Sequence, residues 1–356
     1  MNMQIKRRKS KKIKVGNIFI GGNAPISIQS MTTTDTCDVK ATVAQIKKLE
    51  ELGCQIVRVA VQDMLAATAI KSIKKKVTIP VVADIHFDYR LALMAIKNGV
   101  DKIRLNPGNI QKKSQIEAVL KQAQDKRVPI RIGLNSGSVK RSLSGGVVKD
   151  MIKAARSYER LFKQFKFTDM IFSFKTHDVL STIEVYRRFA VLSDAPLHLG
   201  LTASGLEQEG IVKSSIALGC LLIEGIGDTL RVSLTADPIK EIEAGKRILS
   251  AVGILNEGIE IISCPTCGRC TIDLVDIVSK AEKALKPFSK KLHERKLKVA
   301  IMGCIVNGPG EAKDADIGVA WGGKSGLLFK KGKKIKLIKK SELLSTLVAE
   351  VKNEVV

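Results

Sequence analysis

The chain has 356 residues, of which 45% are hydrophobic, and a formal net charge of +25. This size and apolar content suffice for one large core and a smaller one, so we expect two domains, 1–250 and 251–356. No segment is apolar for long enough to span a membrane, and no apolar stretch of a secretory signal follows the basic run at 6–14. We therefore expect a cytoplasmic protein whose cysteines are thiols or metal ligands rather than disulfides.

The strong positive charge raises the question of nucleic-acid binding. Lys and Arg are spread along the whole chain, and only 3 Tyr, 10 Phe and 1 Trp occur. No motif interleaves aromatic and basic residues in the manner of a base-stacking module. We favour a lysine-rich solvated surface that attracts anionic substrates and acidic electron-carrier proteins, and keep a basic nucleic-acid-binding protein as an alternative.

Apolar strand-like runs alternate with amphipathic helical runs over the first 250 residues. The expected strands are 26–31, 56–61, 81–85, 102–105, 129–134, 169–174, 196–201 and 229–234. The expected helices are 39–52, 65–75, 89–98, 114–125, 148–164, 180–192, 212–222 and 239–249. Strict alternation requires parallel pairing, and eight units are the number that closes a barrel, so the pattern predicts an α/β protein with a (β/α)8 TIM barrel. A doubly wound sheet is the alternative, but no G-x-G-x-x-G follows the first strand.

Polar residues gather where these strands end, which in such a barrel is the mouth. They are Arg58, Arg104, Arg131, Lys175, His198, Arg231 and Ser233. A single strand arginine is equally typical of a rim salt bridge, but Asp84 is the main acid on these strand ends. We therefore expect an uncompensated cluster of cations that binds an anion. Short polar turns at 106–109 and 135–138 add donors, and a diphosphate suits this set better than a carboxylate.

Four of the seven cysteines lie in two short segments of the last third. Residues 264–270 form a C-x2-C-x2-C run, and Cys304 follows an apolar strand-like run at 299–302. This spacing lets several thiolates converge on one soft metal centre. A second C-x-x-C or H-x-H pair, the usual zinc partner, is absent from the sequence, so an iron–sulfur site is favoured over structural zinc. By spacing alone, Cys270 is the natural third thiolate.

Several segments together carry a family resemblance. They are 29–32, 103–109, 131–135, 197–202, 225–234, 263–267 and 303–312, the last reading GCIVNGPGEA. They resemble those of the bacterial 4-hydroxy-3-methylbut-2-enyl diphosphate synthase family over nearly the whole chain. The resemblance implies a TIM barrel followed by a small α+β iron–sulfur domain. It also implies reductive opening and dehydration of 2-C-methyl-D-erythritol 2,4-cyclodiphosphate, an oxidoreductase step of the non-mevalonate isoprenoid pathway.

The resemblance assigns roles to individual residues. It implies that the diphosphate is held by Arg58, Arg104, Arg131, Asn135, Lys175, Arg231 and Ser233. It also implies a [4Fe–4S] cluster whose ligands are Cys264, Cys267, Cys304 and Glu311. Cys270 is then a bystander, contrary to spacing alone. Because a carboxylate is a poorer ligand for iron than a thiolate, Glu311 is expected to be the exchangeable, catalytic ligand.

One position departs from the family pattern. Where the family usually has a glutamate after 199–202, this chain has Ala203. Candidate proton donors in its place are Glu207, with Glu209 on the same loop, His198 and a water bound at the cluster.

The resemblance and the expected topology also indicate partners. A flavodoxin or ferredoxin is expected to deliver the electrons. The eighth helix should carry the chain from the mouth of the barrel to its base, so we expect a homodimer in which each cluster domain caps the partner's barrel. A non-redox barrel enzyme for a phosphorylated ligand, with structural zinc, is the remaining alternative.

Overall fold

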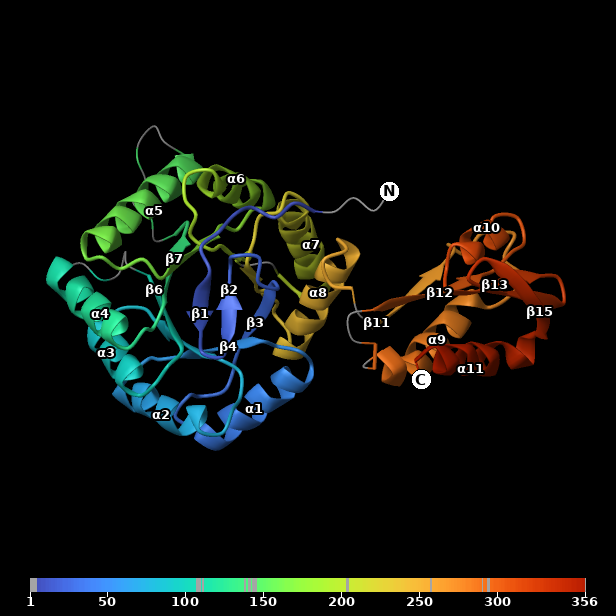
Figure 1. Ribbon diagram of the computed structural model, residues 1–356, viewed down its shortest axis with the longest axis horizontal. Coiled ribbons are helices and arrows are strands. Elements are labelled where there is room, and N and C mark those ends of the chain that lie inside the picture. The colour runs from blue at the N-terminus through green and yellow to red at the C-terminus, as the bar shows by residue number, and fades with distance from the viewer. Residues whose placement is uncertain are drawn as a thin grey trace. The chain divides into compact units, whose positions relative to one another are not determined.

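The computed structural model describes residues 5–106, 110, 112–137, 139, 142, 146–202, 205–256, 258–289, 291–292 and 295–355. These residues form two compact units, Met1–Ile254 and Leu255–Val356. Each unit has its own sheet, and each is described by itself (Figure 1).

The first unit is an eight-stranded parallel barrel ringed by helices (Figure 1). Its strands are β3 (Ser27–Met31), β4 (Ile56–Ala60), β5 (Val81–Ile85), β6 (Lys102–Leu105), β7 (Ile130–Asn135), β8 (Met170–Lys175), β9 (His198–Leu199) and β10 (Thr229–Leu230). They pair in the order β8-β7-β6-β5-β4-β3-β10-β9. A parallel bridge between Phe172 and Leu197 joins β8 to the segment before β9 and closes the ring. The predicted TIM barrel is thus confirmed.

Helices follow the strands in strict alternation. They are α1 (Val39–Glu51), α2 (Met64–Lys74), α3 (Tyr89–Lys97), α4 (Lys113–Asp125), α5 (Gly146–Gln164), α6 (Val179–Ala190), α7 (Glu207–Ile223) and α8 (Pro238–Ala251). Five begin at an aspartate whose carboxylate accepts a backbone N–H of the first turn, namely Asp38, Asp63, Asp88, Asp178 and Asp237. Such caps satisfy N–H groups that the helix leaves free and are worth about 1 kcal/mol each. They fix where the helices begin.

A short hairpin, which we did not expect from the sequence, closes one end of the barrel. Strands β1 (Ile13–Val15) and β2 (Ile18–Ile20) pair antiparallel and lie inside the ring in the view of Figure 1. Their buried side chains Ile13, Val15 and Ile20 pack against Ile56 and Val82 near the starts of two barrel strands. The amino-terminal end of the barrel is therefore filled by apolar residues, and polar chemistry is left to the carboxyl end.

The second unit is a mixed five-stranded sheet with helices on both faces. Its strands are β11 (Gly258–Ser263), β12 (Lys296–Met302), β13 (Ile317–Gly322), β14 (Ser325–Lys330) and β15 (Lys333–Lys339). They lie in chain order, the first three parallel and the last two antiparallel. Its helices are α9 (Leu274–Ser289), α10 (Gly308–Lys313) and α11 (Leu343–Val355), with a 3-10 turn at Lys340–Glu342.

Two apolar clusters hold this sheet to its helices. Residues of α9 and α11, such as Leu285 and Leu347, pack with Trp321 on one face. On the other face, Ala312 of the short helix α10 packs with Ala320 and Phe329. Because α10 is only 6 residues long, it covers only part of its face.

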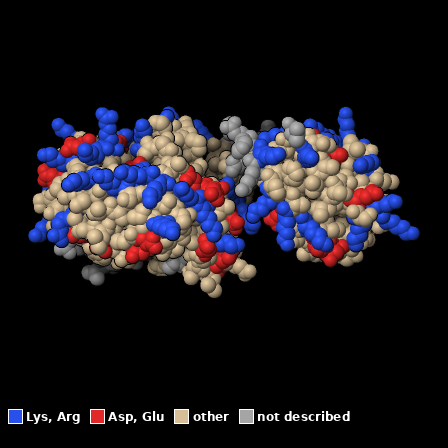
Figure 2. All heavy atoms as spheres, turned by 90° about the horizontal axis from the view of Figure 1, so that it is seen from below, with Lys and Arg blue, Asp and Glu red and all other residues tan. Residues whose placement is uncertain are grey.

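The surface charge is dispersed. On the face seen in Figure 2, Lys and Arg are scattered over both units, with Asp and Glu between them. None of the helices in the described ranges combines the length and apolarity needed to cross a bilayer.

Candidate active site

The carboxyl half of the barrel interior contains a set of buried cations. Arg58 lies in β4, Arg104 in β6, Arg131 in β7 and Lys175 at the end of β8, and all four side chains are buried. Arg104 is paired in register with Arg131, so both side chains point to the same face of the sheet. The structure thus brings these predicted substrate-binding residues together.

Asp84, at the centre of the set, compensates two of the cations. Its carboxylate lies 3.1 Å from Nη1 of Arg104 and 3.6 Å from Nε of Arg58, and His86 Nε2 lies 3.3 Å away. Burial raises the pKa of Asp84, but Arg58, the hydrogen bond from His86 and Arg104 outweigh it and hold the pKa well below its usual range. Burial also lowers the pKa of Arg58 to about 10.

Arg231 has a carboxylate partner on a helix, so the expectation that the cations lack counter-charges is wrong for this one. Its guanidinium binds Glu241 of α8 through two contacts, Nε to Oε2 at 3.0 Å and Nη2 to Oε1 at 2.9 Å. Glu241 also accepts a hydrogen bond from Ser30 Oγ at 2.9 Å. The sequence concealed this pair because Glu241 lies on a helix, 10 residues after the arginine.

Arg131 is the arginine that most lacks compensation. Its side chain is 1% exposed, and Nε and Nη1 have no hydrogen-bond partner within the described part of the chain. Burial, and then the charges of Arg58 and Arg104, lower its pKa well below the usual value. An anion would supply the missing partners.

A buried lysine that we did not expect from the sequence lies close enough to Arg131 to feel its charge. Lys102 is fully buried, and its Nζ has no partner among the described residues. Burial, and then Arg131 and Arg58, lower its pKa strongly. The signal was present in the sequence, because Lys102 precedes Arg104 by two positions and so faces the same side of β6.

His198 is buried among the same cations. Its Nδ1 lies 2.7 Å from Thr229 Oγ1, and its Nε2 has no partner among the described residues. Burial, followed by the charges of Arg131 and Lys175, lowers its pKa well below the usual value, so the imidazole is neutral. A neutral imidazole offers one donor and one acceptor but is a weak acid.

The remaining members of the predicted set lie at or just beyond strand ends. Asn135 is the last residue of β7 and is paired in register with Lys175. Burial lowers the pKa of Lys175 well below its usual value, and neighbouring arginines add to the shift. Ser233 follows β10, and its hydroxyl is buried without a partner in the described residues.

One glycine makes room for a long side chain of the cationic set. A Cβ on Gly133 would overlap the guanidinium of Arg104. A Cβ on Gly200 would be tight only against the backbone oxygen of Arg231, at 3.1 Å, and in ordinary contact with Lys175.

Of the proton donors expected from the sequence, His198 lies among these cations, whereas the carboxylates of Glu207 and Glu209 do not. Glu207 begins α7, and its carboxylate lies 3.4 Å from Lys240 in a largely exposed ion pair. Glu209 pairs with Lys213 at 2.7 Å, also at the surface. Ala203, the turn residues 107–109 and Ser138 lie outside the described residues.

In the second unit, the cysteines lie in loops at the carboxyl ends of parallel strands. Strands β11 and β12 are parallel, and Cys264 and Cys304 follow their carboxyl ends. The backbone N–H of Gly303 donates to Cys264 Sγ at 3.3 Å, so the two cysteine loops are in contact. Cys270 packs against Gly303, and its Sγ lies 3.3 Å from the carbonyl oxygen of Ile272.

The donor set fits a soft metal, although the side chains are not arranged around one. All seven cysteines are free thiols, and hydrogen bonds from the Arg269 backbone lower the pKa of Cys267. Glu311 lies exposed on α10, whose first turn follows the Cys304 loop. Within the described residues, no three His, Cys, Asp or Glu side chains lie close enough together to hold a metal ion. Thiols from adjoining loops with an exposed carboxylate nearby are suitable ligands for iron.

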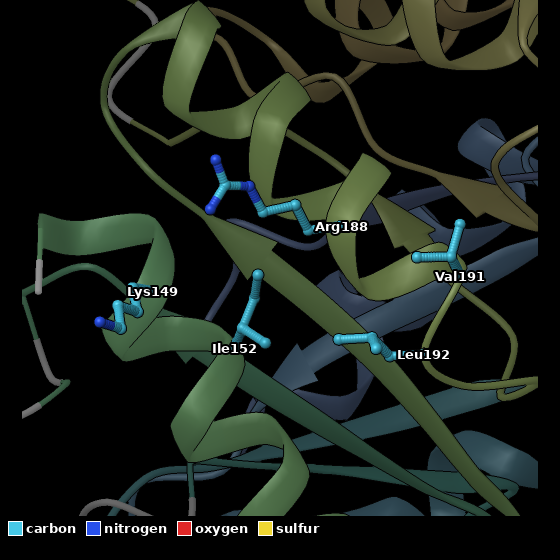
Figure 3. A pocket seen from close by; sticks show the side chains of 5 residues that line it. All are labelled: Lys149, Ile152, Arg188, Val191 and Leu192. Carbon is cyan, nitrogen blue, oxygen red and sulfur yellow. The ribbon is translucent and has the colours of Figure 1, made fainter.

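A hollow on the outside of the barrel has a different character. It lies between α5 and α6 and is lined by Lys149, Ile152, Arg188, Val191 and Leu192 (Figure 3). Its lining is mostly aliphatic and contains no thiol, carboxylate or imidazole. It therefore offers no ligand for iron and no carboxylic acid for proton transfer.

Comparison with known families decides the family of the chain. Residues 10–246 match the GcpE TIM-barrel domain, and residues 260–353 match the GcpE protein C-terminal domain. The chain belongs to the GcpE family. A relative from Ruminiclostridium cellulolyticum is 53% identical over 98% of both chains, and one from Caldanaerobacter subterraneus is 51% identical over 99% of both. Both are named 4-hydroxy-3-methylbut-2-en-1-yl diphosphate synthase (flavodoxin).

Solved structures support the barrel fold alone. Dihydropteroate synthase from Stenotrophomonas maltophilia superposes with a TM-score of 0.52 at 14% identity, covering 69% of this GcpE chain and 100% of that structure. The enzyme from Xanthomonas albilineans gives a TM-score of 0.50, also at 14% identity, covering 69% of this chain and 98% of that one.

Proposed function

We propose that this GcpE protein catalyses the reaction for which its relatives are named. It is an oxidoreductase of isoprenoid biosynthesis that converts 2-C-methyl-D-erythritol 2,4-cyclodiphosphate into (E)-4-hydroxy-3-methylbut-2-enyl diphosphate. The reaction consumes two electrons and protons, opens the ring and releases water. The observation that carries the assignment to this site is the buried, under-compensated cation set around Arg131.

Arg131 and Lys175 are proposed to bind the diphosphate directly, since neither forms an ion pair with a carboxylate in the described part of the chain. Arg58 and Arg104 share Asp84 and retain donors for further phosphate oxygens. Arg231, held by Glu241, lines the site with a fixed orientation. Asn135 and Ser233 add short polar contacts at the strand ends. Charge-assisted hydrogen bonds of this kind contribute about 1.5–3 kcal/mol each.

Enzymes of this family are iron–sulfur proteins. We propose that the cofactor here is a [4Fe–4S] cluster held by Cys264, Cys267, Cys304 and Glu311. Such a cluster supplies electrons and an iron that can accept a substrate oxygen as a Lewis acid. Cys270 is left out because the family resemblance gives that position no ligand role, and its thiol lies 3.3 Å from the Ile272 carbonyl oxygen of its own loop.

Proton delivery requires a group that can reach the reacting oxygen atoms of the substrate. Glu311 is the proposed catalytic carboxylate. His198, neutral and fixed by Thr229, is better suited to orienting the diphosphate than to giving up a proton. Glu207 would have to leave Lys240 to take part.

Flavodoxin is the proposed electron donor, in keeping with the names of the relatives, and ferredoxin is the alternative. We further propose a homodimer in which the cluster unit of one copy serves the barrel of the other.

The decisive experiment is an anaerobic assay of the cyclic diphosphate with reduced methyl viologen, together with iron and sulfide analysis. We expect turnover by a brown protein that contains both elements. A colourless zinc protein that binds pyrophosphate but does not reduce the substrate would instead support a non-redox barrel enzyme.

A further inference from the structure

The sheet of the second unit exposes an apolar strip that begins at the cysteine loops. Ile305 follows Cys304, and its side chain fills the space that a Cβ on Gly322 would occupy. In the register of the sheet, Gly322 pairs with Ser325, and Leu327, two residues further along β14, pairs with Leu337. These side chains therefore share the face of the sheet that α10 covers only in part.

The strip is open to solvent. Ile305 is 63% exposed and Leu337 is 69% exposed, while Leu327 between them is partly buried. Val306, next to Ile305, is 60% exposed. We call Ile305, Leu327 and Leu337 the apolar strip. Adjoining exposed aliphatic side chains of this kind are typical of a surface that another molecule covers.

Cations surround the strip at the same edge of the sheet. Arg269 lies in the first cysteine loop, Lys324 in the turn after β13, and Lys339 and Lys340 at the end of β15. All four are exposed, and Ser325 pairs in register with Lys339, which places these groups at one edge. With strands about 4.8 Å apart, β15 lies roughly 15 Å from the Cys304 loop.

These cations differ from the lysines at the opposite edge of the sheet. There, Lys330 pairs with Glu350 at 3.1 Å and Lys331 with Glu354 at 3.5 Å. Among the described residues, none of the four cationic side chains around the strip is paired with a carboxylate, although Glu342 accepts the backbone N–H of Lys339 at 3.3 Å. Lysines on an edge strand also prevent sheet-to-sheet aggregation, which would account for the charges but not for the exposed leucine and isoleucine.

We propose that the apolar strip and its cationic rim form the docking surface for the acidic, flavin-carrying electron donor. This inference rests on the proposed function, which requires electrons to reach the cysteine loops from a reduced flavodoxin. The rim attracts and orients an acidic partner, and the strip supplies a contact from which water is excluded. Two reduced flavodoxin molecules each give up one electron per turnover and depart oxidised by one electron.

The test compares two electron sources in the holoenzyme. Lys324→Glu with Lys339→Glu should raise the KM for flavodoxin about tenfold or more at low ionic strength, because it reverses the charge that steers association. Turnover with reduced methyl viologen should stay within about twofold of wild type. Leu337→Ser should weaken flavodoxin binding with a smaller dependence on salt.

A matched control is Lys283→Glu with Lys286→Glu, two exposed lysines on α9, which packs on the opposite face of the sheet. Equal flavodoxin KM values in the control and the rim variant would overturn the proposal. Loss of dimerisation in Leu337→Ser, measured by light scattering, would also overturn it and make the strip a contact between copies. If wild type fails with methyl viologen, the proposed function fails, whereas calorimetric titration with flavodoxin still tests the docking surface.

Discussion

Lys102 and Arg131 show how function and stability oppose each other at single residues. Both are almost completely buried, and both have polar atoms without a partner among the described residues. A buried cation without a counter-charge destabilises the folded state, and an arriving phosphate removes that penalty. These two cations therefore destabilise the folded barrel, and binding of an anion between them would reduce that cost.

Replacing Lys102 by methionine should separate these two effects. Methionine has a similar length and no charge, so Lys102→Met should raise the free energy of unfolding of the barrel by about 1–4 kcal/mol. The same change should weaken pyrophosphate binding by about tenfold. Urea unfolding followed by circular dichroism, and calorimetry with pyrophosphate, measure the two quantities.

The pH dependence of this gain follows from the lowered pKa of Lys102. The unfolded chain binds the proton up to about pH 10.5, whereas the folded barrel releases it at lower pH. Between these two pKa values wild-type stability rises with pH, so the advantage of methionine should shrink as the pH approaches 10.5. Lys97→Met, at an exposed position of α3, removes the same charge and should show neither effect. A constant advantage across this range would mean that Lys102 has the same pKa in the folded and the unfolded chain, so that the gain comes from packing and not from removal of a buried charge.

Replacing Cys270 and Cys304 one at a time tests the proposed set of cluster ligands. Cys270 is held by its own loop, whereas Cys304 lies between Gly303 and the exposed Ile305. We expect Cys270→Ser to retain iron, sulfide and activity, and Cys304→Ser to lose all three. Metal analysis and the visible absorption spectrum distinguish the variants. A Cys270→Ser protein without a cluster would restore the all-cysteine set that spacing alone suggests.

The sequence predicts which candidate residues share one face of the sheet wherever strand position fixes the direction of the side chain. Arg58, Arg104, Arg131 and Lys175 could be placed because alternation along a strand fixes the side that a residue faces. Glu241 could not, since its contact with Arg231 depends on how α8 packs against β10. The sequence alone contains no local signal for such a contact.

At the scale of elements, the eight β/α units were predictable, but the strand lengths were not. The segments at 196–201 and 229–234 read as six-residue strands, yet only His198–Leu199 and Thr229–Leu230 have regular pairing. Beyond them, the backbone N–H of Arg231 still donates to the Leu199 carbonyl at 2.9 Å, but residues 232–234 have no regular strand pairing. The hairpin β1–β2 was missed because three-residue strands are too short to show periodicity.

The hairpin makes a prediction about barrel stability. Ile20 is fully buried in the plug of the barrel, so Ile20→Ala should lower the free energy of unfolding by about 2–4 kcal/mol. Phe19→Ala, at a neighbouring position that is 44% exposed, should cost much less. Urea unfolding followed by circular dichroism measures both.

The single tryptophan lets the two units be followed separately. Trp321 is buried in the core of the second unit, so its fluorescence reports that unit alone. With Ile20→Ala, the circular dichroism transition of the barrel should move to lower urea, and the fluorescence transition should not. No change in either transition would show that the hairpin contributes little to the barrel.

The topology of the barrel places the end of its last helix far from the buried cations at the mouth. Helix α8 follows β10, starts near the mouth and has 14 residues. At 1.5 Å per residue it carries the chain about 20 Å toward the base of the barrel. The second unit begins at Leu255, only a few residues after α8 ends. Reduction of a bound substrate requires near contact, and the proposed homodimer, in which a second copy supplies the cluster unit, would meet this requirement.

A shared site of this kind predicts complementation between two inactive variants. Arg131→Ala should weaken diphosphate binding by about 10- to 100-fold, so that little activity remains at low substrate concentration, while leaving the cysteine loops intact. Cys304→Ser should leave the barrel intact and remove the cluster. When the two are mixed and allowed to exchange subunits, each heterodimer should contain one site with both a working barrel and a working cluster unit. Activity should therefore rise from near zero toward about a quarter of the wild-type value, since about half of randomly formed dimers are heterodimers with one competent site each. Viologen-driven turnover measures the gain, and native mass spectrometry verifies that heterodimers have formed. Verified heterodimers without activity, or full activity from a monomer, would mean that each chain completes its own site.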